Sequence, residues 1–295
     1  MTSPIFGRVL TAMVTPMTPA GDVDEDAVLA VADHLLAHSH DGIVVNGTTG
    51  ESATLTSDES IRVIELVAAH VGDRAVVVAG VGSNDTAHSI DMARRAAAVG
   101  ARGLLVVTPY YNKPTQPGLV AHFGAVADAT DLPVLVYDIP GRTGIPIQTE
   151  TLIRLAERPR IVAVKDAKGD LWAASQVMAA TDLQWYSGDD VLNLAHLAQG
   201  AVGVVSVVGH VAGDEYAAMV RAVADGDLAT ARSIHRRLIP VVQAIMSPSQ
   251  GAIMAKAALA ELGVIPSAFV RLPLVESPPE HLAMLREGLS QSGIL

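Results

Sequence analysis

The sequence predicts a (β/α)8 TIM barrel followed by a small C-terminal helical domain. Short apolar runs rich in β-branched residues recur along the chain, and Ala- and Leu-rich stretches of helical period separate them. Hydrophobic residues make up 50% of the chain but aromatic residues only 3%, so aliphatic side chains must fill a large core. A doubly wound sheet is the main alternative, and the count of eight strand–helix units favours the barrel.

Each apolar run is short enough to be a buried parallel strand. The predicted strands are residues 9–14, 42–46, 75–79, 103–107, 133–137, 161–165, 183–186 and 202–207. Helical period predicts helices in residues 27–37, 58–71, 86–99 and 117–128. Thr56 or Ser57 can cap the second of these helices. The carboxyl ends of the strands should meet on one rim, where active sites of this fold form.

The last part of the chain has a different pattern. No strand candidate follows Asp227, and three helices are predicted at residues 229–246, 250–262 and 279–290. We therefore expect a catalytic barrel in residues 1–226 and a helical domain in residues 227–295.

Composition and charge narrow the function classes. A net charge of −11 disfavours nucleic acids and anionic membranes as partners, because both require a basic face. The absence of cysteine excludes disulfides, thiolate metal sites and cysteine nucleophiles, and it fits the cytosol. Residues 1–10 lack the apolar core of a signal peptide, and the most apolar window, 200–213, is too short to span a bilayer. We expect a cytoplasmic protein.

Two nucleotide-binding motifs fail on inspection. Gly80 and Gly82 follow a strand and precede a helix, as in a dinucleotide-binding fingerprint, but the third glycine is replaced by Asp85. No Gly-Lys-Ser/Thr sequence occurs, so a P-loop is absent.

Metal-binding patterns are similarly weak. The acids at 22, 24 and 26 imitate a calcium loop, but Ala27 stands where the turn needs glycine, which favours helix capping. His38 and His40 lie at a helix end without a partner motif, and we interpret them as exposed capping residues. No HExxH pattern accompanies the ten histidines, so we expect no metal and no cofactor.

Lys165 is the first candidate for a catalytic side chain. It ends the apolar run 161–164, which is typical of a buried parallel strand. Desolvation disfavours the charged form of an amine there, which lowers its pKa and makes it nucleophilic near neutral pH. The alternatives are an ion pair with Asp166 or a place at a sheet edge.

Other polar residues would share the rim with this lysine. The turn 47–52 sets backbone N–H groups beside the hydroxyls of Thr48 and Thr49, which suits a small carboxylate, although capping threonines in a tight turn are the alternative. Tyr137 ends the fifth strand and is either a proton shuttle or a barrel-lining side chain. Arg142 follows it and could pair with a substrate carboxylate or lie on the surface.

Together these residues suggest one chemistry. An amine nucleophile, a phenol, hydroxyl donors and a guanidinium are the set needed for Schiff-base formation or cleavage of carbon–carbon bonds. Tyr110 and Tyr111 follow the fourth strand and could serve the site or an interface.

Five segments then carry a resemblance to a known superfamily. They are residues 47–52 (GTTGES), residues 108–114 (TPYYNKP), Tyr137 with Pro140 and Arg142-Thr143-Gly144, Lys165, and residues 187–190 (SGDD). With the same order and spacing over essentially the whole chain, the sequence resembles the dihydrodipicolinate synthase and N-acetylneuraminate lyase superfamily, most closely its dihydrodipicolinate synthase family. The resemblance implies a (β/α)8 barrel with a helical C-terminal domain, a homotetramer, and no metal or organic cofactor.

The resemblance also implies a reaction and roles for residues. Members condense pyruvate with aspartate-4-semialdehyde on the route to diaminopimelate and lysine. Lys165 would form the Schiff base with pyruvate. The implied proton relay consists of Tyr137, Thr49 and Tyr111, the last from a neighbouring subunit. The implied substrate-binding residues are Thr48 and Thr49 for the pyruvate carboxylate, Arg142 for the carboxylate of the aldehyde, and Gly188 and Val205 beside the keto acid.

Three departures from the family pattern lie near this site. Asp138 stands where asparagine is usual, Gly141 replaces a common serine, and residues 166–169 read DAKG where EATG is frequent. None of them belongs to the implied relay. Arg142 favours the synthase over sialic acid lyase, whose substrate lacks a carboxylate in that place.

A further departure concerns inhibition by lysine. Ser57 and His88 stand where lysine-inhibited relatives carry a histidine and a glutamate, although Asn84 and Tyr110 are kept. Without the acid that would bind the effector's ammonium group, we expect lysine to inhibit poorly or not at all.

Two other functions stay open from the sequence. A 2-keto-3-deoxy sugar acid aldolase would use the same chemistry with another acceptor, and a non-catalytic barrel could bind a keto acid without reacting. The intact set of Lys165, Tyr137, Thr49 and Tyr111 argues against the second.

Overall fold

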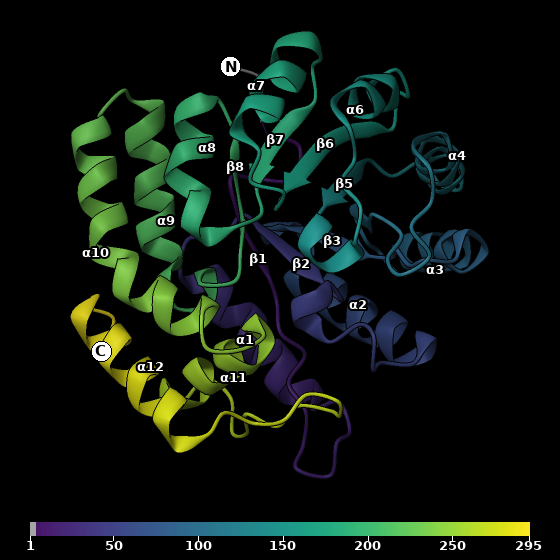
Figure 1. The fold of residues 1–295 in the computed structure, drawn as a ribbon. Coiled ribbons are helices and arrows are strands. Elements are labelled where there is room, and N and C mark those ends of the chain that lie inside the picture. The colour runs from purple at the N-terminus through teal and green to yellow at the C-terminus, as the bar shows by residue number, and fades with distance from the viewer. Residues whose placement is uncertain (1–3) are drawn as a thin grey trace.

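The structure is a computed structural model that describes residues 4–295. The prediction that residues 1–10 form no signal peptide falls partly on residues 1–3, which lie outside the described residues. Eight parallel strands close into a barrel in chain order, as the sequence predicts (Figure 1). The strands are β1 Val9–Ala12, β2 Gly42–Val45, β3 Val76–Gly80, β4 Gly103–Val107, β5 Val134–Asp138, β6 Ile161–Asp166, β7 Gln184–Ser187 and β8 Gly203–Ser206.

Helices surround the barrel and cover its outer face. They are α1 Glu25–Ala37, α2 Ser57–Val71, α3 Thr86–Ala98, α4 Gln116–Ala127, α5 Pro140–Thr143, α6 Thr149–Ala156, α7 Leu171–Ala180, α8 Asn193–Gln199 and α9 Gly209–Ala224, with short 3-10 helices η1 Thr48–Gly50, η2 Gly72–Arg74 and η3 Asp190–Leu192. Asp24 caps α1 by accepting a hydrogen bond from Ala27 N, which confirms the capping interpretation. Thr56 and Glu59 form a reciprocal capping box at the start of α2.

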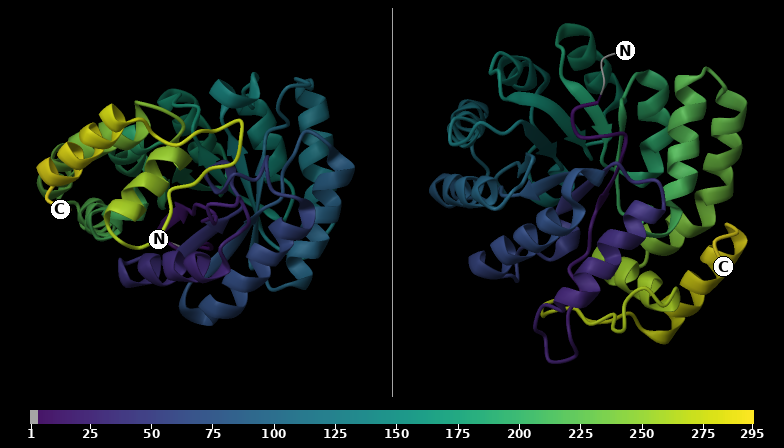
Figure 2. Two further views of the ribbon diagram at one scale, coloured as in Figure 1. Left: turned by 90° about the horizontal axis from the view of Figure 1, so that it is seen from below. Right: turned by 180° about the vertical axis from the view of Figure 1, so that it is seen from behind.

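Three further helices follow the barrel. They are α10 Leu228–Met246, α11 Gly251–Glu261 and α12 Pro279–Gln291. Figures 1 and 2 show them gathered on one side of the barrel, where α10 packs against α9 and α12. Helix α11 also contacts η1 at the mouth of the barrel. The boundary between residues 226 and 227 stays a prediction.

Side chains along the strands alternate between the inside and the outside of the barrel, except at an irregularity in the β5–β6 ladder, where Val162 and Ala163 both pack in the inner cluster. The inner cluster contains Phe6, Leu10, Ala12, Val44, Val78, Leu105, Leu135, Tyr137, Ala163, Tyr186 and Val205. Val136 and Val164 belong instead to the larger cluster between the strands and the helices. The alternation therefore directs Lys165, two residues after Ala163, into the barrel, and directs Asp138 and Asp166 outward.

Two sequence-based expectations need correction. The first strand ends at Ala12 rather than Val14, because the ladder stops there: Met13 N still donates to Val44 O at 2.9 Å, but Val14 N donates to His210 Nε2 at 3.0 Å. The expectation that His40 is exposed is wrong. Its ring is 4% exposed and bonds to Thr11 Oγ1 at 2.7 Å and to Leu35 O at 2.9 Å.

No single helix within residues 4–295 has both the length and the apolar character needed to cross a membrane. Helices α10 and α11, bent by 113° relative to each other, meet that requirement only as a pair and only by length and composition.

Candidate active site

Lys165 and Tyr137 lie side by side on the inner face of the barrel. Strands β5 and β6 pair in register so that Tyr137 is opposite Lys165. The Lys165 ammonium lies 4.1 Å from the centre of the Tyr137 ring, within the range of a cation–π contact. Both side chains are buried, at 4% and 6% exposure. The alternative of an ion pair between Lys165 and Asp166 is absent among residues 4–295, and Asp166 points out of the barrel.

Burial changes the acid–base properties of both groups. It lowers the pKa of Lys165 to about 7. The negative charge of Asp190 opposes this shift, and the positive charge of Arg142 adds to it. At neutral pH about half of such amines are unprotonated, compared with about one in three thousand at the ordinary pKa. Burial also raises the pKa of Tyr137 to about 12, although Arg142 opposes the shift, so the phenol keeps its proton.

Gly188 leaves space for the lysine side chain. A β-carbon at this position would lie 2.7 Å from Lys165 Cγ and 3.0 Å from Lys165 Cε. Any larger residue would therefore push the lysine from its place. Val205 is fully buried in the inner cluster on β8, the strand that pairs with β7.

Thr48 and Thr49 lie in η1, directly after β2. Gly47 precedes this short helix, and Glu51 ends it in the left-handed conformation with φ of 57°. Thr49 is buried, whereas Thr48 is exposed and lines the cavity described below. The turn thus carries both threonines at the carboxyl end of β2, and its Gly50 N and Glu51 N donate within the turn, to Gly47 O at 3.0 Å and Thr48 O at 3.1 Å.

Glu51 is a supporting residue that the sequence did not reveal. Its side chain is 1% exposed and forms an ion pair with Lys256 of α11, which is fully buried. Glu51 Oε2 also accepts a hydrogen bond from Arg271 N at 3.0 Å. The turn that carries Thr48 and Thr49 is therefore fixed to α11 and to the segment between α11 and α12.

Asp190 is a second supporting residue. Its Oδ2 accepts hydrogen bonds from Val207 N at 2.8 Å and Val208 N at 3.0 Å, and its Oδ1 accepts from Asn193 and Ser206. The carboxylate thereby joins the end of β7 to the end of β8. Asp190 belongs to the segment 187–190 that resembles the family, but its hydrogen-bond partners could not be predicted from the sequence.

Arg142 lies in α5, on the segment between β5 and α6. This short helix begins with Pro140, and Thr143 Oγ1 bonds to Ile139 O and Ile145 O. Arg142 is exposed and lines the same cavity as Tyr137 and Thr48. The guanidinium is therefore available to an anion that enters the barrel mouth.

The cavity has a volume of about 430 Å³ and opens at the carboxyl ends of β2 to β5. It brings together Thr48, Tyr137 and Arg142 but extends beyond them towards α2 and α3. Tyr110, Ser57 and His88 line this extension. Lys165, Thr49, Gly188 and Val205 do not line it directly.

Tyr111 is separate from this group. Its side chain is 89% exposed, and its φ of 73° is unusual for a residue other than glycine. A single chain therefore does not bring Tyr111 to Tyr137 and Thr49. Among residues 4–295, no group of three or more His, Cys, Asp or Glu side chains could hold a metal ion.

Comparison with known proteins identifies the family of the chain. Residues 5–292 match the model of the dihydrodipicolinate synthetase family. A 4-hydroxy-tetrahydrodipicolinate synthase of Kineococcus radiotolerans is 59% identical over 98% of this chain and 94% of that protein. The protein of the same name from Acidothermus cellulolyticus is 56% identical over 98% of this chain and 93% of its own length.

Solved structures give the same result. The lysine-bound dihydrodipicolinate synthase of Cyanidioschyzon merolae has a TM-score of 0.96 and 43% identity over 99% of each chain. The pyruvate complex of the enzyme from Acinetobacter baumannii has a TM-score of 0.94 and 34% identity, and covers 99% of this chain and 100% of that one. Because sequence and fold both match over nearly the full length, the chain belongs to the dihydrodipicolinate synthetase family, whose members are enzymes of the lyase class.

Proposed function

We propose that this chain is a 4-hydroxy-tetrahydrodipicolinate synthase, which condenses pyruvate with L-aspartate-4-semialdehyde through a Schiff base on Lys165. The observation that carries the proposal is the position of Lys165, buried beside Tyr137 with a pKa lowered to about 7. An unprotonated amine of this kind adds readily to a ketone. Pyruvate is bound in the solved relative from Acinetobacter baumannii, and aspartate semialdehyde is the second substrate that the resemblance to the family implies.

The chemistry balances with the groups present. The Lys165 amine adds to C2 of pyruvate, and loss of one water gives the imine. Removal of a methyl proton converts the imine to an enamine, whose carbon attacks the aldehyde and forms the new carbon–carbon bond. The aldehyde oxygen takes up one proton, in balance with the one lost from the methyl group, and Tyr137 can donate it because its pKa near 12 keeps it protonated. The amino group of the aldehyde substrate then attacks the imine carbon and passes its two protons to the lysine nitrogen. The ring closes as the Lys165 amine leaves, which frees the enzyme.

Two anion-binding positions suit the two carboxylates. The η1 turn offers Thr48 and Thr49 to the carboxylate of pyruvate at the mouth of the barrel. Arg142, across the same cavity, suits the carboxylate of the aldehyde substrate. The second candidate function is a sugar acid aldolase. The Arg142 guanidinium favours the synthase, because aspartate semialdehyde brings a carboxylate for it to bind.

The proposal includes a homotetramer in the cytoplasm. Tyr111 is the support for assembly, because it is 89% exposed in the single chain and the implied relay requires it at Tyr137. A Tyr111→Phe variant should then lose most of its activity although its own subunit's cavity is intact. Full activity in that variant would contradict a relay completed by a neighbour.

Reductive trapping tests the proposed function. Borohydride added with pyruvate should give a single adduct, which intact mass detects and peptide mapping locates on Lys165. A Lys165→Arg variant is the matched control and should form none. An adduct elsewhere, or none in the parent chain, would refute the mechanism. Coupled assays with aspartate semialdehyde and with sugar-derived aldehydes would then separate the synthase from the aldolase.

A further inference from the structure

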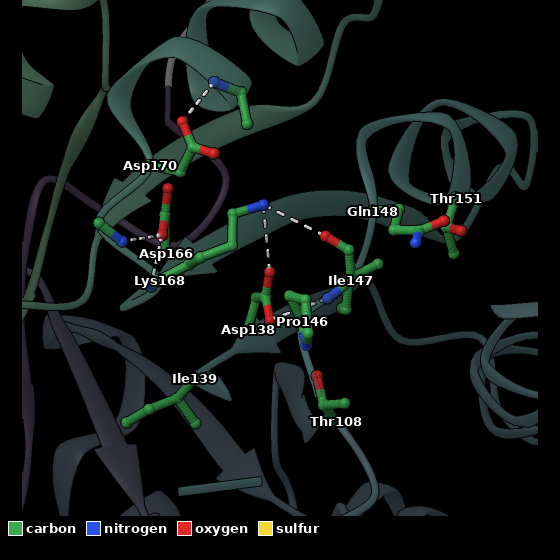
Figure 3. Close-up of polar contacts among 12 residues, drawn as sticks. Thr108, Asp138, Ile139, Pro146, Ile147, Gln148, Thr151, Asp166, Lys168 and Asp170 are labelled. Carbon is green, nitrogen blue, oxygen red and sulfur yellow. Dashed lines mark hydrogen bonds and ion pairs between the residues drawn. The ribbon is translucent and has the colours of Figure 1, made fainter. Parts of the chain in front are cut away.

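Asp138 and Lys168 together hold one residue, Ile147, from both sides (Figure 3). Asp138 Oδ1 accepts a hydrogen bond from Ile147 N at 3.1 Å. Lys168 Nζ donates to Ile147 O at 3.2 Å and lies 3.7 Å from Asp138 Oδ2. The two charged side chains and one peptide unit therefore form a closed group on the outer side of β5 and β6.

This group closes the loop that carries Arg142. Residues 139–147 leave β5 at Asp138 and return to the side chain of the same residue at Ile147. Inside the loop, Thr143 Oγ1 bonds to Ile139 O and Ile145 O, so the segment has its own internal ties. Ile147 itself is fully buried. The position of Arg142 above the cavity therefore depends on where Ile147 is held.

Strand β6 fixes the cation of the pair. Asp166 Oδ1 accepts hydrogen bonds from Lys168 N at 2.7 Å and Gly169 N at 3.3 Å, which sets the turn from which Lys168 extends. Ala167 N donates to Asp138 O at 2.9 Å and joins the two strand ends. Asp166 and Asp138 are neighbours in register, each directly after one of the reacting residues of the inner face.

The pair is buried and electrostatically coupled. The Asp138 side chain is 2% exposed and that of Lys168 14%. Burial raises the pKa of Asp138 to about 7, with Lys168 and the Ile147 N–H acting against the shift and Asp166 adding to it. A buried carboxylate that loses its cation partner is either left unpaired or takes up a proton, so removal of Lys168 disturbs the group that Asp138 forms with Ile147 N.

We propose that Asp138 and Lys168 are positioning residues that place Arg142 and so set the affinity for the carboxylate of the second substrate. The inference rests on the proposed function, because it assumes that Arg142 binds the aldehyde. It assigns no contact with substrate to either member of the pair. Their effect on the reaction runs through Ile147 and the backbone of residues 139–147.

Four proteins test the proposal: the parent chain, Lys168→Thr, Asp138→Asn, and the double variant. In Lys168→Thr the KM for aspartate semialdehyde should rise about tenfold, while kcat and the KM for pyruvate stay within about twofold, since a displaced charge-assisted contact acts on one substrate only. In the Asp138→Asn background the same lysine change should raise that KM by about threefold or less, because no unpaired carboxylate remains.

Controls separate positioning from loss of structure. Arg158→Thr removes a cation of an exposed ion pair with Asp128 near the other end of β6, and should leave the aldehyde KM unchanged. Lys168→Met, which keeps an apolar stem, replaces Lys168→Thr if the latter does not fold. A merely structural role would lower the active fraction and the melting temperature without changing KM for one substrate.

Three results would overturn the proposal: an unchanged aldehyde KM in Lys168→Thr, an equal rise in both KM values, or the same effect of the lysine change in both backgrounds. Each of these results differs from what failure of the proposed function would give. If the proposed function fails, the parent chain forms no pyruvate adduct on Lys165 and no condensation product.

Discussion

The ion pair between Glu51 and Lys256 should contribute to stability and to pyruvate binding at the same time. Lys256 is fully buried and also donates to Phe269 O at 2.8 Å, and burial lowers its pKa while Glu51 opposes the shift. A Lys256→Met change keeps most of the side-chain volume but leaves the Glu51 carboxylate, among residues 4–295, with the N–H of Arg271 as its one remaining hydrogen-bond donor. The carboxylate would then be a buried, poorly compensated charge.

The magnitude follows from the burial of both groups. Breaking a buried pair by removing one partner costs about 4 kcal/mol. An unfolding entropy near 2.1 cal/mol/K per residue gives about 0.6 kcal/mol/K for 295 residues, so the melting temperature should fall by about 6 °C. Because Glu51 ends the turn that carries Thr48 and Thr49, the KM for pyruvate should rise severalfold as well.

Calorimetry and steady-state kinetics measure the two effects in the same samples. Arg286→Met is the matched control, since it removes a cation of an exposed pair with Glu261 and should leave both quantities near the parent values. A Glu51→Gln/Lys256→Met double variant should be more stable than Lys256→Met alone. A Lys256→Met protein that melts within about 1 °C of the parent would refute the coupling argument, and so would a lower melting temperature with unchanged pyruvate KM.

Three further predictions follow from the titratable groups. Burial lowers the pKa of His40 to about 4 and of His210 to about 3. As the pH falls below about 6.5, these histidines take up protons in the unfolded chain but not in the folded one, so the free energy of unfolding decreases. At pH 5 each histidine should lower the free energy of unfolding by about 2 kcal/mol. In urea titrations at several pH values, His40→Gln should make the decrease of this free energy with falling pH less steep. The rate of pyruvate trapping should rise as pH passes through about 7, and Arg142→Met should move that rise to higher pH, because the guanidinium lowers the pKa of Lys165. Lysine should inhibit weakly, and His88→Glu should increase its effect; half-inhibition of the parent at sub-millimolar lysine would be evidence against this.

The fold was accessible from the sequence because its signal is local. Apolar runs of strand length alternate with helical periods, and the predicted run 103–107 coincides with β4. The errors occur where an apolar residue is buried without joining the sheet, as Val14 does, or where a ring folds back under a helix, as His40 does. The spacing of apolar residues and the composition predict which segments are buried, but they do not predict which buried polar groups form hydrogen bonds with each other.

The site was partly accessible for the same reason. Lys165 and Tyr137 end apolar runs, and strand ends meet on one rim. Glu51 and Lys256 are 205 residues apart, and nothing local links an acid in a turn to a lysine in an otherwise apolar helix. Their pairing depends on how α11 returns to η1, which only the three-dimensional arrangement decides.

Alternation along β5 and β6 connects the predicted site to the part that was not predicted. If Tyr137 and Lys165 point into the barrel, then Asp138 and Asp166 must point out of it, and the register sets them side by side. The inner pair can react only if it is desolvated, and the outer pair can tie down loops only if its charges are compensated. Lys168 supplies that compensation for Asp138, while Asp166 accepts backbone N–H groups of its own turn. The same two strands thus present the chemistry on one face and the support for the substrate-binding loop on the other.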